Sequence, residues 1–133
     1  MDFFSEFASD EKLEIEGRWV DYNPEIKFKI ARSGNKHFGR IFTREYNKNK
    51  VLIESKSDAG EEKSNEVMAR VFAKTILVGW EGPVKFQGKD YSAYSEDKAF
   101  EMLKLKEFRR WVASHAEDFE AYKALQEQDE AKN

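Results

Sequence analysis

Hydrophobic and polar positions alternate along the first part of the chain. Two runs of apolar residues at every second position flank the pair Asn23-Pro24, which indicates a turn. These residues are Leu13, Ile15, Gly17 and Trp19 in the first run and Ile26, Phe28 and Ile30 in the second. Because a period of two is typical of half-buried strands, the pattern predicts an antiparallel β-hairpin over residues 12–31. Trp19, Phe28 and Ile30 are expected on one face of it, covered by helices.

After residue 35, the apolar residues recur with the period of a helix. This period predicts four helices, over residues 36–47, 65–78, 96–114 and 117–126. Asn35 and Ser95 stand where N-caps are expected, and Gly79 stands where a left-handed C-cap would end the second of these helices.

Three segments do not follow the period of these helices. Val51, Leu52 and Ile53 predict either a third short strand or another apolar turn, whereas residues 55–65 are polar and contain glycine, which predicts an exposed loop. Residues 127–133 have no apolar period and are expected to form a flexible tail. The length of 133 residues predicts one domain over residues 1–126. Its class is α+β, mainly helical, with an N-terminal antiparallel β-hairpin.

Residues that could carry catalysis or hold a cofactor are few. The chain has no cysteine, and its two histidines, His37 and His115, lie far apart without a partner at ligand spacing. It contains no glycine-rich phosphate loop and no nucleophile elbow. It also has no signal peptide and no apolar stretch as long as a membrane span. We therefore expect an intracellular protein that is not an enzyme, binds no cofactor or metal and does not enter a membrane.

Charge is distributed unevenly, although the net charge is only −3. Residues 1–16 contain six acids and one base, whereas residues 17–50 contain nine bases and three acids. Arg40, Arg44 and Lys48 line one side of the predicted helix over residues 36–47 and could bind phosphates. Its aromatic residues fall on the apolar stripe rather than among the bases, and the sequence pI is about 5.6. Nucleic-acid binding is therefore kept as an alternative and is not the favoured function.

Aromatic residues near the Gly79–Gly82 corner suggest protein binding. Phe72, Trp80 and Tyr91 either belong to the core or line a groove that holds an amphipathic partner helix. We take these three residues as the candidate protein-binding site.

Four stretches of the sequence carry a resemblance to a known family. They are GRWVDYNPEIKFKIARSGNKHF (residues 17–38), ARVFAKTILVGWEG (69–82), DYSAYSEDKAFEML (90–103) and FRRWV (108–112). Their order and spacing resemble the tail assembly chaperones of long-tailed, siphovirus-type bacteriophages. The resemblance covers roughly residues 17–119, and one departure is that residues 46–53 turn apolar where the family has a more regular charged segment.

This resemblance implies a role in virion morphogenesis, late in infection and in the host cell cytoplasm. Such chaperones bind the long, apolar tape measure protein, keep it soluble while the tail tube assembles, and are left out of the mature virion. The family also makes a longer product by a programmed frameshift, whose extra domain is thought to recruit the tail tube protein, so this chain would be the short product. Self-association is expected as well. A structural tail subunit is a further alternative.

Overall fold

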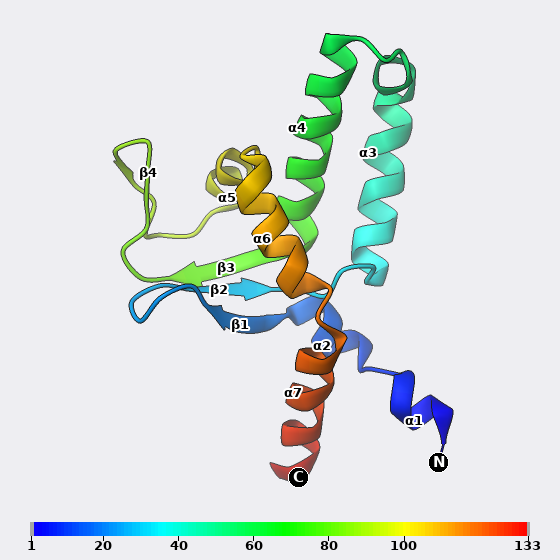
Figure 1. The fold of residues 1–133 in the computed structure, drawn as a ribbon, viewed down its shortest axis with the longest axis vertical. Coiled ribbons are helices and arrows are strands. Elements are labelled where there is room, and N and C mark those ends of the chain that lie inside the picture. The colour runs from blue at the N-terminus through cyan, green and yellow to red at the C-terminus, as the bar shows by residue number, and fades with distance from the viewer. Residues whose placement is uncertain (1, 133) are drawn as a thin grey trace.

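A computed structural model describes residues 2–132 and shows a helical protein built around a small sheet (Figure 1). Its helices are α1 (Phe3–Phe7), α2 (Glu11–Glu16), α3 (Lys36–Glu54), α4 (Asp58–Thr75), α5 (Glu96–Leu103), α6 (Lys106–Ala116) and α7 (Phe119–Lys132). Its strands are β1 (Arg18–Asp21), β2 (Lys27–Ile30), β3 (Leu77–Glu81), β4 (Lys85–Phe86) and β5 (Lys89–Asp90). The mixed class in which helices dominate is therefore confirmed.

The central strand of the sheet is β2. It pairs antiparallel with β1 on one side and with β3 on the other, so that Val20, Phe28 and Trp80 lie side by side on one face. Side chains from α4, α5 and α6 pack on that face and form one apolar core with it. The short strands β4 and β5 make a separate two-stranded ribbon beyond β3.

Helix α7 is tied to the sheet through Tyr122. This side chain is fully buried, and its hydroxyl donates a hydrogen bond of 2.6 Å to the carbonyl oxygen of Ile30. The same helix holds the N-terminal segment, because Lys123 Nζ donates to the carbonyl of Ala8 and Asp10 N donates to Gln126 Oε1. Both ends of the chain therefore lie on the same side of the sheet, away from the far ends of α3 and α4 (Figure 1).

The predicted β-hairpin is correct only from Arg18 onward. Residues 11–16 form a helix because the side chain of Asp10 accepts a hydrogen bond from Leu13 N at its start and Gly17 ends it at a φ of +87°. A Cβ at Gly17 would lie 2.7 Å from the carbonyl oxygen of Ile30, so a glycine is needed where the chain turns into β1. Capping at both ends outweighs the alternating pattern here.

Trp19 does not share a face with Phe28 and Ile30, which corrects the predicted covered face. The register pairs Trp19 with Lys29 and Val20 with Phe28, so Val20 enters the core and Trp19 remains 41% exposed. Lys27 lies over the Trp19 ring, with Nζ 4.7 Å from the ring centroid. Which alternate residues share a face depends on the pairing register, and the sequence of one strand does not contain it.

Helix boundaries differ from the predicted ones at several places. The helix predicted over residues 36–47 continues to Glu54, and the predicted loop over residues 55–65 is mostly the first part of α4, which Ser57 caps by accepting from Gly60 N. Helix α4 ends at Thr75, and Gly79 lies inside β3 opposite Lys29 rather than at a helix C-cap.

The C-terminal boundaries also differ. The helix predicted over residues 96–114 is split into α5 and α6 near Lys104 and Leu105. The last helix begins at Phe119 and continues through the expected tail to Lys132, with Gln126 Nε2 donating to Glu130 Oε1 one turn later.

Replacing Tyr122 by Phe tests the link between α7 and the sheet. We expect Tyr122→Phe to lower the free energy of unfolding by about 1–2 kcal/mol, because it leaves a buried carbonyl with one hydrogen bond fewer. Denaturant unfolding measures the change. Tyr22→Phe is the matched control, because Tyr22 is 58% exposed and its hydroxyl has no hydrogen-bond partner among residues 2–132.

Stability at high pH tests the same contact. Burial raises the pKa of Tyr122 to about 12, above its ordinary value of 10.0. A tyrosine with a raised pKa stabilises the folded state fully below pH of about 10 and loses that contribution as pH rises toward about 12. The difference in unfolding free energy between the native protein and Tyr122→Phe should therefore shrink over this range. A difference that stays constant would contradict this reading of the contact.

Candidate protein-binding surface

Helices α3 and α4 form a helical hairpin whose far end stands clear of the sheet (Figure 1). It begins at Asn35, a buried residue whose side-chain oxygen accepts from Phe38 N at 2.8 Å while its amide donates to the carbonyl of Arg32. This double hydrogen bond fixes the start of α3 against the body of the protein. The near end of the hairpin packs on the core. At the far end, α3 and α4 pack only on each other.

One side of α3 carries a row of aromatic rings. Phe38 stacks on Phe42 and Phe42 stacks on Tyr46, with centroids 5.9 Å apart in both pairs. Residues four apart lie above one another on a helix, and Ile53 continues the row two turns beyond Tyr46. We call Phe38, Phe42, Tyr46 and Ile53 the aromatic face. All four are half-buried, so each ring or chain keeps part of its surface open to a partner.

The aromatic face runs into a shallow groove between the two helices near their tip. The groove is lined by Ile53 and Ser57 together with Gly60, Ser64 and neighbouring polar residues. Gly60 is buried in it, and a Cβ there would collide with the carbonyl oxygen of Leu52 on α3. The missing side chain allows the two helices to approach closely at this end.

A second row on α3 is basic. Arg40, Arg44 and Lys48 are each four residues apart and exposed, and Val51 continues the row three residues later. We call these four residues the basic face. Glu45 lies 3.9 Å from both Arg44 and Lys48, while Arg40 has no ion pair within residues 2–132. The bases are thus exposed and lie on a different side of the helix from the stacked rings, both as the sequence predicts.

The predicted protein-binding residues lie mainly in the core. Phe72 is 7% exposed and meets Phe38 edge to face at 6.1 Å, and Trp80 is 4% exposed on the core face of β3. In this fold neither side chain offers appreciable area to a partner. Phe72 instead packs against Phe38, the first residue of the aromatic face.

Tyr91 differs from the other two. It is half-buried, stacks on Phe86 at 5.4 Å and has Lys98 Nζ 5.7 Å from its ring centroid. Its carbonyl accepts the Trp80 indole N–H at 2.7 Å. The structure therefore brings Trp80 and Tyr91 together, through a bond that fastens the ribbon to the sheet rather than through a shared surface.

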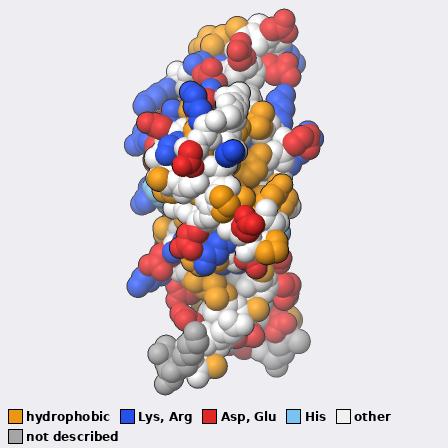
Figure 2. All heavy atoms as spheres, turned by 90° about the vertical axis from the view of Figure 1, so that its left-hand side faces the viewer, with side chains coloured by type: hydrophobic (Ala, Val, Ile, Leu, Met, Phe, Trp, Pro, Cys, Tyr) orange, Lys and Arg blue, Asp and Glu red, His pale blue; other side chains and the backbone are white. Residues whose placement is uncertain are grey.

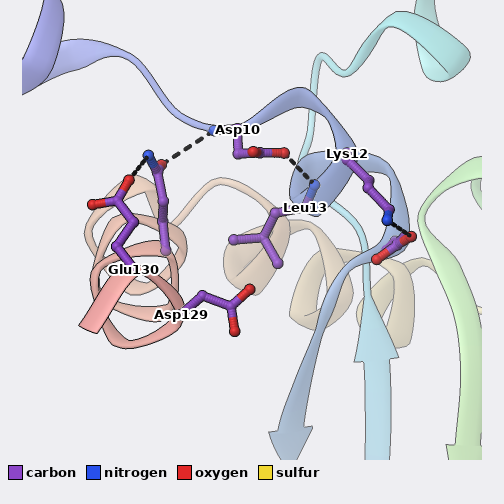
Figure 3. A pocket seen from close by; sticks show the side chains of 7 residues that line it. Asp10, Lys12, Leu13, Asp129 and Glu130 are labelled. Carbon is purple, nitrogen blue, oxygen red and sulfur yellow. Dashed lines mark hydrogen bonds and ion pairs between the residues drawn. The ribbon is translucent and has the colours of Figure 1, made fainter. Parts of the chain in front are cut away.

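A pocket between α2 and α7 is polar and acidic (Figure 3). It is lined by Asp10, Lys12, Leu13, Glu16, Gln126, Asp129 and Glu130. Asp10 accepts from Leu13 N, Lys12 pairs with Glu16 at 3.8 Å, and Gln126 bonds both Asp10 N and Glu130. Within residues 2–132 no group of acids or histidines has the arrangement of a metal site. Most of these polar groups therefore form hydrogen bonds or ion pairs with one another. The bond between Asp10 and Gln126 attaches the N-terminal segment to α7.

The face that carries β4 and α5 shows no single-sign field. Lys, Arg, Asp and Glu side chains are interspersed there with apolar patches (Figure 2). This face therefore lacks the concentrated bases of a nucleic-acid surface, whereas the basic face belongs to α3, which lies on the other side of the molecule (Figure 1). None of the helices in residues 2–132 combines the length and apolar character needed to cross a membrane.

The aromatic face was only partly foreseen from the sequence. The continuation of the apolar row to Leu52 and Ile53 could have been found, because Ile53 falls at the helical spacing from Phe42 and Tyr46. What hid it was the polar segment that follows, which predicts a loop although it forms the start of α4. Exposure of this face depends on the hairpin standing away from the sheet, which no local pattern contains.

A known protein family matches most of the chain. The described residues form a mixed α and β fold with a helical hairpin whose aromatic residues are half-buried. Residues 33–133 match the model of the YdaY prophage protein family, so the chain belongs to that family. No curated protein and no solved structure matches it. The match includes α3 and α4 in full and supports the phage origin expected from the sequence.

The close approach of α3 and α4 is tested by two glycines. Gly60→Ala should lower the free energy of unfolding by about 1–3 kcal/mol, because the new methyl group must push the helices apart. Gly39→Ala should raise it by up to about 1 kcal/mol, since Gly39 is inside α3 with open space around it and alanine favours the helix. Denaturant unfolding of both variants measures the two shifts, and equal shifts would contradict the packing described at the tip.

Proposed function

We propose that this protein is a tail assembly chaperone that binds the tape measure protein of its phage and keeps it soluble in the host cytoplasm. Two observations support the proposal: membership of a prophage family, and a helical hairpin whose aromatic face is only half-buried. The role needs no catalysis, and we propose that the protein is not an enzyme and is left out of the mature virion.

The aromatic face suits a helical client. An extended helix with exposed apolar residues aggregates unless those residues are covered. Phe38, Phe42, Tyr46 and Ile53 form an apolar strip along about four turns of α3. A strip of this kind can take the apolar side of a partner helix along its length. Because the strip is one helix wide, several copies of the protein would bind along one tape measure protein.

A longer, frameshifted form is compatible with this arrangement. Helix α7 ends on the opposite side of the molecule from the tip of the hairpin (Figure 1). A domain continuing from α7 would therefore emerge away from the aromatic face. We propose that such a domain contacts the tail tube protein while the hairpin holds the tape measure protein.

Co-expression with the tape measure protein tests the function. We expect the tape measure protein to be soluble and to co-purify with the native chain. Replacing both Phe42 and Tyr46 by Ser should lower its soluble fraction at least about tenfold, because each ring contributes about 1.5–3 kcal/mol of apolar burial to the contact. Soluble and pelleted fractions are quantified by gel densitometry.

Val51→Ser is the matched control for this experiment. Val51 is 88% exposed on the basic face, so its replacement should leave the tape measure protein soluble. Circular dichroism shows whether the double variant keeps its helices. A tape measure protein that stays insoluble with the native chain would refute the proposed function, and full solubility with the folded double variant would refute the assignment of the aromatic face.

A further inference from the structure

The N-terminal helix exposes an apolar surface that no other segment within residues 2–132 covers. Phe3, Phe4 and Phe7 are 70%, 78% and 69% exposed, and Phe3 stacks on Phe7 with centroids 6.2 Å apart. Helix α1 contains no buried residue. Three adjacent, open phenylalanines are unusual on a monomer and mark an interaction site.

The charges beside these rings point to a basic partner. Asp2 and Glu6 flank the phenylalanines and make no ion pair with any residue of the described chain. The neighbouring acids on α2 already bind bases of the same molecule, since Glu11 lies 3.0 Å from Lys36 and Glu14 lies 3.9 Å from Arg32. The acidic N-terminal segment is thus complementary to the basic segment that leads into α3, and α1 continues this acidity.

The basic face of α3 has the matching chemistry. Arg40, Arg44 and Lys48 stand in a row that ends at Val51, which is 88% exposed. Leu52, beside Val51, is 38% exposed and lies one turn beyond Lys48. The far end of this face therefore offers two apolar side chains bordered by bases, the complement of phenylalanines bordered by acids.

The two surfaces do not meet within one molecule. Val51 lies fifteen residues beyond the start of α3, which is about 22 Å along the helix axis. Only Ala8, Ser9 and Asp10 connect α1 to α2, and three extended residues span about 10 Å. Lys123 and Gln126 of α7 also hold the backbone of Ala8 and Asp10. The partner of α1 is therefore not the α3 of its own chain.

We propose that α1 of one copy docks on the basic face of α3 of a second copy. Phe3 and Phe7 would cover Val51 and Leu52, with Asp2 and Glu6 beside Arg44 and Lys48. Helix α1 and the tip of α3 lie at opposite ends of the elongated molecule (Figure 1). Two copies arranged antiparallel make the contact twice, which gives a dimer with two-fold symmetry. This inference concerns the isolated protein and does not rest on the proposed chaperone function.

Sedimentation equilibrium of the full chain over a range of concentrations tests the proposal. We expect the mass of two copies at the higher concentrations. Replacing Phe3 and Phe7 by Ser should weaken dimerisation at least about tenfold through lost apolar burial. Because α1 has no buried residue, this variant should keep the helical content of the native chain and, at concentrations where both are monomeric, its thermal stability.

A charge exchange identifies the partner surface. Glu6→Lys and Arg44→Glu should each weaken dimerisation, and an equimolar mixture of these two variants should restore it. In the mixed dimer one contact joins Lys and Glu in exchanged positions, and the other is native. Arg110→Glu is the control for Arg44→Glu, since Arg110 is an exposed base on α6 and its replacement makes the same change in net charge as Arg44→Glu.

The outcomes are decisive. A native chain that has the mass of one copy at every concentration overturns the proposal. So does a dimer that persists in the Phe3 and Phe7 variant, or one whose charge variants are not restored by mixing. Binding of the tape measure protein by the Phe3 and Phe7 variant would remain unaffected, so failure here is distinguishable from failure of the chaperone function.

Discussion

Strand β2 is the element on which the rest of the structure depends. It pairs with β1, which follows α2, and with β3, which follows α4 almost fifty residues later. Its last residue is Ile30, whose backbone lies against Gly17 and pairs with Leu77. The carbonyl oxygen of Ile30 also accepts a hydrogen bond from the hydroxyl of Tyr122. Contacts at Ile30 therefore fix the start of β1, the chain that follows α4 and the position of α7. Pairing at such long sequence separation carries an entropic cost of closing the intervening loop, which the apolar core must offset.

The helical hairpin follows from this arrangement because only its near end can be buried. Asn35 and Phe72 belong to the end that packs on the body, where the core is continuous. The outer turns of α3 and α4 have only each other, and Gly60 allows them to pack closely without a large core. Side chains at the outer turns consequently divide into an aromatic row and a basic row that are both partly open. A small domain has a limited core volume, so parts of its helices remain outside the core. These parts can present such a surface while the sheet stays folded.

We propose a separate use for each of the two rows of α3. The aromatic face is suited to a long apolar client, whereas the basic face is complementary to the acidic, phenylalanine-rich α1 of another copy. Because the rows lie on different sides of one helix, a dimer would still present its aromatic faces.

The sequence by itself determined the class of fold, the existence of most helices, and the caps at Asn35 and Ser95, because helical period and capping are local properties. It also predicted the aromatic and basic rows of α3, which need only the spacing of residues 36–48. It failed at residues 12–16 and 58–65, where caps at Asp10 and Ser57 produce helices in segments that look like a strand and a loop. Tertiary structure alone decided that Trp80 and Phe72 are core, that Trp19 faces solvent, and that Gly79 belongs to a strand. The positions of Trp19, Trp80 and Gly79 depend on the registers of β2 with β1 and β3, and register is a property of the pair rather than of either segment. Phe72 is buried because this end of α4 packs on the core and on Phe38.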